Sequence, residues 1–185
     1  MTVYRSLLFL GLAALSGACS STPEYAPDSP HYAYPADMRL NLTRPLTIPA
    51  EQATLRLQYG HPVARNGVEE SQPYCIFELD TVAATPQQVR PDTFRVTRFQ
   101  RRVETASAMP TRPWRVAGPA VGFDDRPSHL YYISEFRLHS DAQPQVRALA
   151  CQSNQAAAGI AIPRHLTLAE IRRALGEYFV VELPR

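Results

Sequence analysis

Residues 130–138, LYYISEFRL, are the stretch of the sequence that decides the fold. Large apolar side chains recur here with a period of two, and those that share one face are Leu130, Tyr132, Phe136 and Leu138. This period is typical of a β-strand with one buried face. The sequence therefore predicts a strand that places this face on a hydrophobic core.

The next apolar segment, residues 146–151, follows after a short turn that contains Pro144. Two apolar segments joined in this way favour a β-hairpin. Val146, Leu149 and Ala150 also fit the i, i+3, i+4 spacing of a helix, so a helical segment is the alternative.

Similar alternation predicts strands in the first half of the chain. Residues 40–48 alternate around Pro45, which predicts an edge strand or two short pieces, and residues 55–59 alternate again. Residues 74–79 carry apolar side chains on both faces, as expected of a central strand. Further strands are predicted near residues 94–103 and 178–183, and His61-Pro62 predicts a turn.

One helix is predicted near the C-terminus. Thr167 and Glu170 have the spacing of a capping box, in which each side chain bonds a backbone amide of the other. Leu166 and Ile171 fit a hydrophobic staple, and Gly176 supplies a stop. Together these elements predict an α+β fold: a mainly antiparallel β sheet of about six to eight strands, as a sandwich or partial barrel, with one C-terminal helix.

The N-terminus carries the pattern of an exported protein. Arg5 precedes an apolar core at about residues 7–15, which has roughly half of the length that a membrane-spanning helix needs. The core ends in residues 15–19, LSGAC. This segment resembles the lipobox of bacterial lipoproteins over residues 1–21, although Ser16 stands where leucine is usual. Residues 16–18 also fit the cleavage site of a plain secretory signal.

The resemblance implies cleavage before Cys19, attachment of two or three acyl chains to that cysteine, and sorting to the outer membrane with the domain facing the periplasm. The resemblance predicts a lipoprotein signal peptide at residues 1–18. The proline content after Cys19 and the alternation that begins near Met38 then predict a lipidated cysteine with a Pro-rich tether at residues 19–37 and a single β-rich globular domain at residues 38–185. Tyr25, Tyr32 and Tyr34 in the tether are either a partner-binding stripe or part of a plain linker.

Two cysteines remain once Cys19 is assigned to lipid. Cys75 and Cys151 are then an even pair in an oxidising compartment, and we expect a disulfide between them. On the chain-entropy model, closing a loop of about 77 residues stabilises the fold by roughly 4 kcal/mol. Two buried thiols are the alternative.

Residues 90–115 hold seven arginines against two carboxylates. Clustered guanidinium groups suit phosphates and carboxylates, so anionic lipid headgroups, lipopolysaccharide phosphates or an acidic protein are candidate partners. Strict alternation places Arg95 and Arg101 on one face of a strand and Arg98 and Arg102 on the other. A solvated edge strand, whose charges discourage unwanted pairing, is the alternative.

A long Pro- and Gly-containing stretch at residues 106–128 holds the single tryptophan, Trp114. Loops of this length are often functional, which makes Trp114 a candidate ligand or partner contact. The alternative is that Trp114 and Phe123 fill the edge of the core.

No pattern in the sequence predicts catalysis. The fingerprints of serine hydrolases, zinc peptidases, P-loop proteins and Rossmann folds do not occur, and the five histidines are scattered. We therefore name no catalytic residue, no cofactor and no metal site, and an enzymatic activity is not expected, although distant residues can still form a site. A formal net charge of +2 argues against nucleic-acid binding by bulk charge.

These observations predict a lipid-anchored, non-enzymatic envelope module that binds or stabilises a protein assembly. A binder of an envelope lipid or glycan is the alternative, and a hydrolase is a third possibility.

Overall fold

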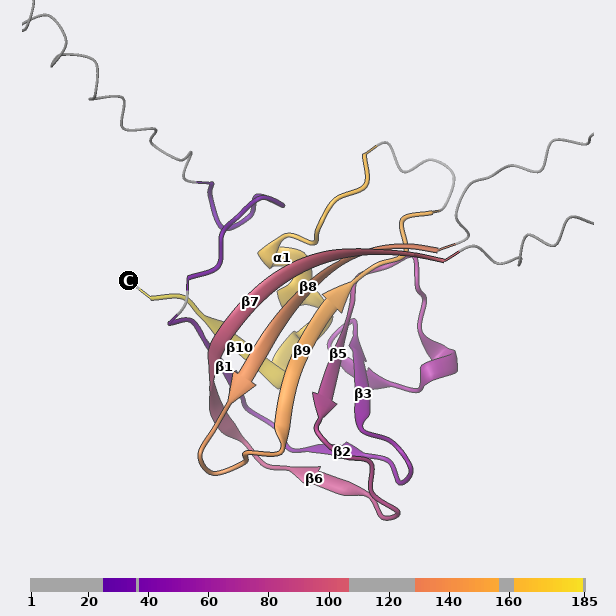
Figure 1. Ribbon diagram of the computed structural model, residues 1–185, viewed down its shortest axis with the longest axis vertical. Coiled ribbons are helices and arrows are strands. Elements are labelled where there is room, and N and C mark those ends of the chain that lie inside the picture. The colour runs from indigo at the N-terminus through magenta and orange to yellow at the C-terminus, as the bar shows by residue number, and fades with distance from the viewer. Residues whose placement is uncertain (1–24, 36, 107–128, 157–161, 185) are drawn as a thin grey trace, which may run out of the picture.

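A computed structural model describes residues 25–35, 37–106, 129–156 and 162–184 of the chain. Most of the described residues lie in one large sheet (Figure 1). Its strands, in chain order, are β1 (Arg39–Leu42), β3 (Thr54–Gln58), β4 (His61–Val63), β5 (Tyr74–Leu79), β7 (Asp92–Ala106), β8 (His129–His139), β9 (Val146–Gln152) and β10 (Phe179–Glu182).

The eight strands pair in the spatial order β10-β1-β7-β8-β9-β5-β3-β4, and every neighbouring pair is antiparallel. The sheet curls into a half-barrel, so it has an inner face and an outer face (Figure 1). Strands β2 (Leu46–Ile48) and β6 (Gln87–Val89) form a separate antiparallel pair at the lower end of the view. The α+β prediction is therefore confirmed.

Helix α1 (Leu168–Leu175) packs against the inner face, where it contacts β3, β5 and β10 (Figure 1). Thr167 and Glu170 form the predicted capping box, in which the Thr167 side chain accepts from the Glu170 amide. The helix buries the side chains of Leu168, Ile171, Ala174 and Leu175. A short 3-10 helix, η2 (Gly176–Tyr178), follows and leads into β10, while a second one, η1 (Arg65–Gly67), follows β4.

Several local predictions are settled by the strand pairing. Strand β9 pairs with both β8 and β5, which excludes the helical alternative for this segment. Pro45 separates β1 from β2, so the two-piece interpretation of residues 40–48 is confirmed. The turn predicted at His61-Pro62 is wrong: both residues belong to β4, an edge strand in which the missing amide of proline costs no ladder bond.

The domain also includes part of the segment assigned to the tether. We call residues 29–35 the strap, because they lie against the inner face of the sheet. Tyr34 is only 8% exposed, and its ring lies 4.7 Å from that of Phe99 and 5.0 Å from that of Phe136. Tyr32 packs partly buried against the same core. Packing therefore begins before the expected boundary at residue 38, because aromatic side chains among the prolines supply apolar surface to bury.

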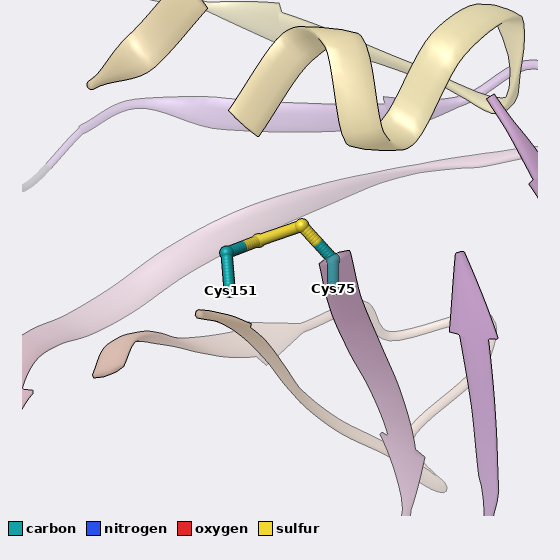
Figure 2. Close-up of a disulfide and its surroundings, with 2 residues drawn as sticks. All are labelled: Cys75 and Cys151. Carbon is teal, nitrogen blue, oxygen red and sulfur yellow. A yellow bond between two sulfur atoms is a disulfide. The ribbon is translucent and has the colours of Figure 1, made fainter. Parts of the chain in front are cut away.

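The disulfide joins neighbouring strands of the large sheet (Figure 2). Cys75 of β5 and Cys151 of β9 are directly opposite in the ladder, with their Cα atoms 4.0 Å apart and both residues fully buried. The predicted bridge is therefore confirmed, and it ties β5 to β9 beneath α1 (Figure 2).

Candidate interaction surface

A β-bulge in the long β7–β8 ladder decides where the predicted arginines point. Val96 is opposite Leu138, but the next pair is Arg98 with Arg137, so Thr97 is an extra residue in β7. An extra residue reverses the alternation of side chains beyond it. Arg95 therefore shares the outer face with Arg98 and Arg102, while Arg101 lies on the inner face. The predicted division of these four side chains is wrong for this reason.

Neighbouring strands extend this outer surface. Arg39 of β1 is directly opposite Arg95, and Arg137 of β8 is directly opposite Arg98. We call the five outward side chains the arginine face, and its members are Arg39, Arg95, Arg98, Arg102 and Arg137. Strand β1 pairs with β7 only over residues 92–95, so the later part of β7, which holds Arg98 and Arg102, has β8 as its one neighbouring strand among the described residues. The interpretation of these charges as protection of a strand edge therefore stays open.

Two members of the arginine face are neutralised by carboxylates. Glu135, whose side chain is 8% exposed, forms ion pairs with Arg102 and with Arg137, the latter at 3.1 Å. Glu104 also pairs with Arg102, at 2.7 Å. Because Glu135 is buried and shared, it fixes both guanidinium groups against the sheet.

Of the other three members, Arg39 lies directly opposite Glu182 of β10, whereas Arg95 and Arg98 have no carboxylate directly opposite them in the described strands. Arg39, Arg95 and Arg98 are exposed and form no ion pair with any residue that the structure describes. Like charges directly opposite in a ladder destabilise a sheet, and the Arg39–Arg95 pair is of this kind. Arg137, which lies opposite Arg98, is balanced by Glu135. The arrangement can accept phosphate or carboxylate groups from outside, because these guanidinium groups form no ion pair within the described part of the chain.

Arg101 has a different environment from the other predicted arginines. Its Nη2 donates to the carbonyl of Tyr32 in the strap at 2.8 Å, and its guanidinium lies 5.4 Å from the centre of the Phe99 ring. Partial burial lowers the pKa of Arg101. It is therefore a contact between sheet and strap, and not part of the outer surface.

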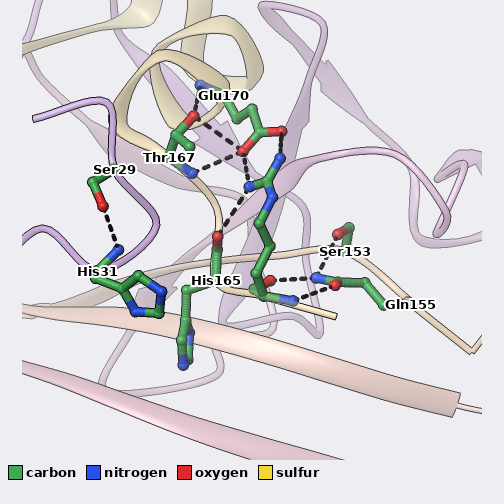
Figure 3. A network of polar contacts seen from close by, with 8 residues as sticks. Ser29, His31, Ser153, Gln155, His165, Thr167 and Glu170 are labelled. Carbon is green, nitrogen blue, oxygen red and sulfur yellow. Dashed lines mark hydrogen bonds and ion pairs between the residues drawn. The ribbon is translucent and has the colours of Figure 1, made fainter. Parts of the chain in front are cut away.

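A polar cluster at the start of α1 has a structural role (Figure 3). Arg164 donates to both carboxylate oxygens of Glu170, at 2.7 and 2.8 Å, and the Thr167 amide donates to the same carboxylate at 2.8 Å. Burial on its own raises the pKa of Glu170, but the hydrogen bonds from Arg164 and Thr167 outweigh it and hold the pKa at about 2. Gln155 clamps the Arg164 backbone from the other side.

Two hollows accompany these features. One of about 660 Å³ lies beside β3 and β4, where Arg56, Arg65 and Glu70 are among its lining residues. A second, of about 210 Å³, borders the Arg164–Glu170 pair. Neither is lined by the arginine face, and no group of metal-binding side chains occurs among the residues that the structure describes.

Cys19 and Trp114 lie outside the described residues, so their predicted roles stay predictions. No helix in the described ranges has the length and apolar character needed to cross a membrane. Sequence reasoning missed Arg39 and Arg137, because cross-strand neighbours far apart in the chain give no local signal. No family model matches the chain, and neither a curated protein nor a solved structure matches it.

Proposed function

We propose that the chain is a lipid-anchored envelope protein without enzymatic activity, which binds an acidic envelope protein through its arginine face. The single observation that carries this proposal is that three exposed arginines, Arg39, Arg95 and Arg98, form no ion pair with a described residue, and that Arg39 and Arg95 lie directly opposite each other. A protein that keeps such pairs loses some stability in the free state. An acidic partner removes this penalty when it binds, because its carboxylates pair with the guanidinium groups.

The length of chain between Cys19 and Tyr25 limits how far from the membrane such a partner can lie. Five residues lie between Cys19 and Tyr25, the first described residue, so six residue-to-residue steps join them, and even a fully extended chain spans at most about 3.6 Å per step. The path from a lipidated Cys19 to the described part of the chain is therefore at most about 22 Å. This supports a partner at the membrane surface, in the outer membrane or close to its periplasmic side.

The disulfide gives independent support for an exported domain. Bridges of this kind persist in the periplasm and are rare in reducing cytosol. The bridge between Cys75 and Cys151 is consistent with export, and so is the signal pattern at residues 1–21.

Photo-crosslinking in cells tests the proposal. The chain has no lysine, so amine-reactive reagents have no side chain to modify. A photoreactive phenylalanine at Thr93, which is exposed on the outer face beside Arg95, samples the arginine face. The same group at Val82, which is 59% exposed in the loop between β5 and β6, is the positional control.

The charge is tested with matched variants. We expect Arg95→Gln/Arg98→Gln to abolish the Thr93 adduct, and Arg65→Gln/Arg173→Gln, two exposed arginines on η1 and α1, to preserve it. An adduct that survives Arg95→Gln/Arg98→Gln contradicts the proposal. Binding to vesicles that contain anionic lipid, with no protein adduct, favours the lipid-binding alternative instead.

A further inference from the structure

The inner face of the sheet holds a cluster of polar atoms that lack partners. Four buried side-chain polar atoms have no hydrogen-bond partner among the described residues, and three of them are Arg101 Nε, Ser134 Oγ and His165 Nδ1. Buried polar groups are almost always paired, with protein, water or a ligand. Three unpaired groups in one place therefore call for an explanation in terms of an occupant.

The three residues come together from separate segments. Arg101 of β7 and Ser134 of β8 are directly opposite in the ladder, on the same inner face as Phe99 and Phe136. Residues in this relation have Cβ atoms about 5 Å apart. The His165 ring lies 5.2 Å from that of Tyr132, which is two residues before Ser134 and shares its face.

The direction of His165 agrees with this placement. In Figure 3 its side chain points away from the Thr167–Glu170 network and toward the strands of the sheet. His165 therefore does not belong to the polar cluster that caps α1. We call Arg101, Ser134 and His165 the inner cluster.

The charge of the inner cluster is uncompensated. Within the described ranges the Arg101 side chain forms no ion pair, and its one hydrogen bond goes to the neutral carbonyl of Tyr32. A guanidinium group that is partly removed from water without a counter-charge is costly. An anion in contact with Arg101 removes this cost.

The donor set also selects an anion. Arg101 can only donate, the Ser134 hydroxyl can donate, and a neutral imidazole can place its proton on either ring nitrogen. Burial first, and then the charges of Arg101 and His31, lower the pKa of His165 to about 4, so the ring is neutral at pH 7. All three groups can therefore donate a hydrogen bond to the same acceptor. A cation, in contrast, is repelled by the positive charge of Arg101.

We propose that Arg101, Ser134 and His165 form a binding site for a small oxyanion, a phosphate or a carboxylate, which the strap covers. The Tyr32 carbonyl accepts a hydrogen bond from Nη2 of Arg101, and Nε of the same guanidinium group has no partner among the described residues. Tyr34 holds the strap in place through its ring contacts with Phe99 and Phe136. The anion enters when the strap lifts. This site is independent of the arginine face, because its residues lie on the opposite face of the sheet.

Anion titrations of the full chain test the site. Sodium phosphate and sodium acetate are titrated separately at constant ionic strength, with chloride as the reference salt, and binding is followed by calorimetry and by the shift in Tm. We expect Arg101→Gln to weaken binding at least about tenfold and Ser134→Ala to weaken it less, because Arg101 supplies the charge. Arg147→Gln, at an exposed position of β9, is the control that leaves binding unchanged.

A second experiment tests whether the strap controls access of the anion to the site. A site that is open only part of the time binds with an apparent affinity reduced by that fraction. Tyr34→Ala removes the aromatic anchor, so we expect it to tighten anion binding about tenfold or more. If this variant does not fold, hydrogen exchange of the unaltered chain replaces it, and anion binding is expected to speed the exchange of the amides in residues 29–35.

The results of these experiments distinguish support for the site from its rejection. A response to phosphate alone or to acetate alone supports the site and names its class of ligand. The proposal is overturned if neither anion binds the unaltered chain nor changes exchange in the strap. It is also overturned if binding is lost in Arg95→Gln/Arg98→Gln but kept in Arg101→Gln, because the anion then sits on the outer face.

Discussion

Gly60 and Gly176 meet backbone to backbone, and this contact joins the β3–β4 turn to the end of α1. The Gly60 amide donates to the Ala174 carbonyl at 3.1 Å, and a Cβ on Gly60 would lie 3.1 Å from the Gly176 Cα. Both glycines have positive φ, at 80° and 56°. The helix is thereby fixed to one side of the half-barrel, while η2 and β10 continue from it to the other side.

We expect Gly176→Ala to destabilise the fold by about 2 kcal/mol or more, because the new methyl group collides with Gly60 and the backbone conformation disfavours a side chain. Gly67→Ala is the matched control, since a Cβ there meets nothing within 4 Å. Urea unfolding of the three chains measures the difference. Equal losses of stability in both variants would show that the contact between Gly60 and Gly176 does not contribute to the free energy of unfolding.

The bridge between Cys75 and Cys151 is expected to protect both thiols completely in the folded protein. In a Cys19→Ser chain, alkylation without reductant should label no cysteine, and alkylation after reduction in urea should label two. Reduction should lower the free energy of unfolding by about 2–4 kcal/mol, because the bridge limits the unfolded chain. Two labelled thiols in non-reduced protein would contradict the bridge.

Glu170 should make the stability of the domain depend on pH below neutrality. Its folded pKa of about 2 is lower than the ordinary value of 4.5, so its contribution is present above pH 4.5 and is lost as the pH falls through about 2. We expect Glu170→Gln to cost on the order of 2 kcal/mol at pH 7 and almost nothing near pH 2.

Denaturant unfolding as a function of pH measures this effect. Glu177→Gln is the control, because the Glu177 side chain is 77% exposed and its pairing with Arg44 is at the surface. A Glu170→Gln penalty that stays constant between pH 7 and pH 2 would refute the assignment of the charge to this pair.

The arginine face is expected to reduce the stability of the free domain. Arg95→Gln relieves repulsion from Arg39 across the ladder and should raise the free energy of unfolding by about 0.2–1 kcal/mol at low salt. The gain should shrink as salt screens the charges. Arg173→Gln, on the exposed side of α1, should show no such gain. A loss of stability in Arg95→Gln would mean that this arginine has a structural partner.

The sequence predicts much of the fold because the signals involved are local. Alternation identifies β3 and β8, and the spacing of Thr167 and Glu170 identifies the start of α1. The disulfide also follows from local reasoning, since Cys75 and Cys151 remain once Cys19 is assigned to lipid. These features depend on residues that are close in the sequence or on the number of cysteines, and both can be read from one sequence.

The arginine face was harder to predict because it depends on one inserted residue. Thr97 has no turn or glycine signal, yet it moves Arg95 onto the same face as Arg98 and places Arg101 on the other. Strict alternation fails at such a bulge. The burial of Tyr34 was missed for a related reason: proline content identifies an extended segment but does not indicate what it packs against.

The central claim, that the arginine face binds an acidic envelope protein, is tested most directly by the photo-crosslink at Thr93 in living cells. The account predicts one acidic envelope protein joined to the Thr93 chain, absent from the Val82 chain, lost in Arg95→Gln/Arg98→Gln and retained in Arg65→Gln/Arg173→Gln. An adduct with the same yield in both double variants, or no protein adduct from Thr93 in a folded and lipidated chain, would contradict it.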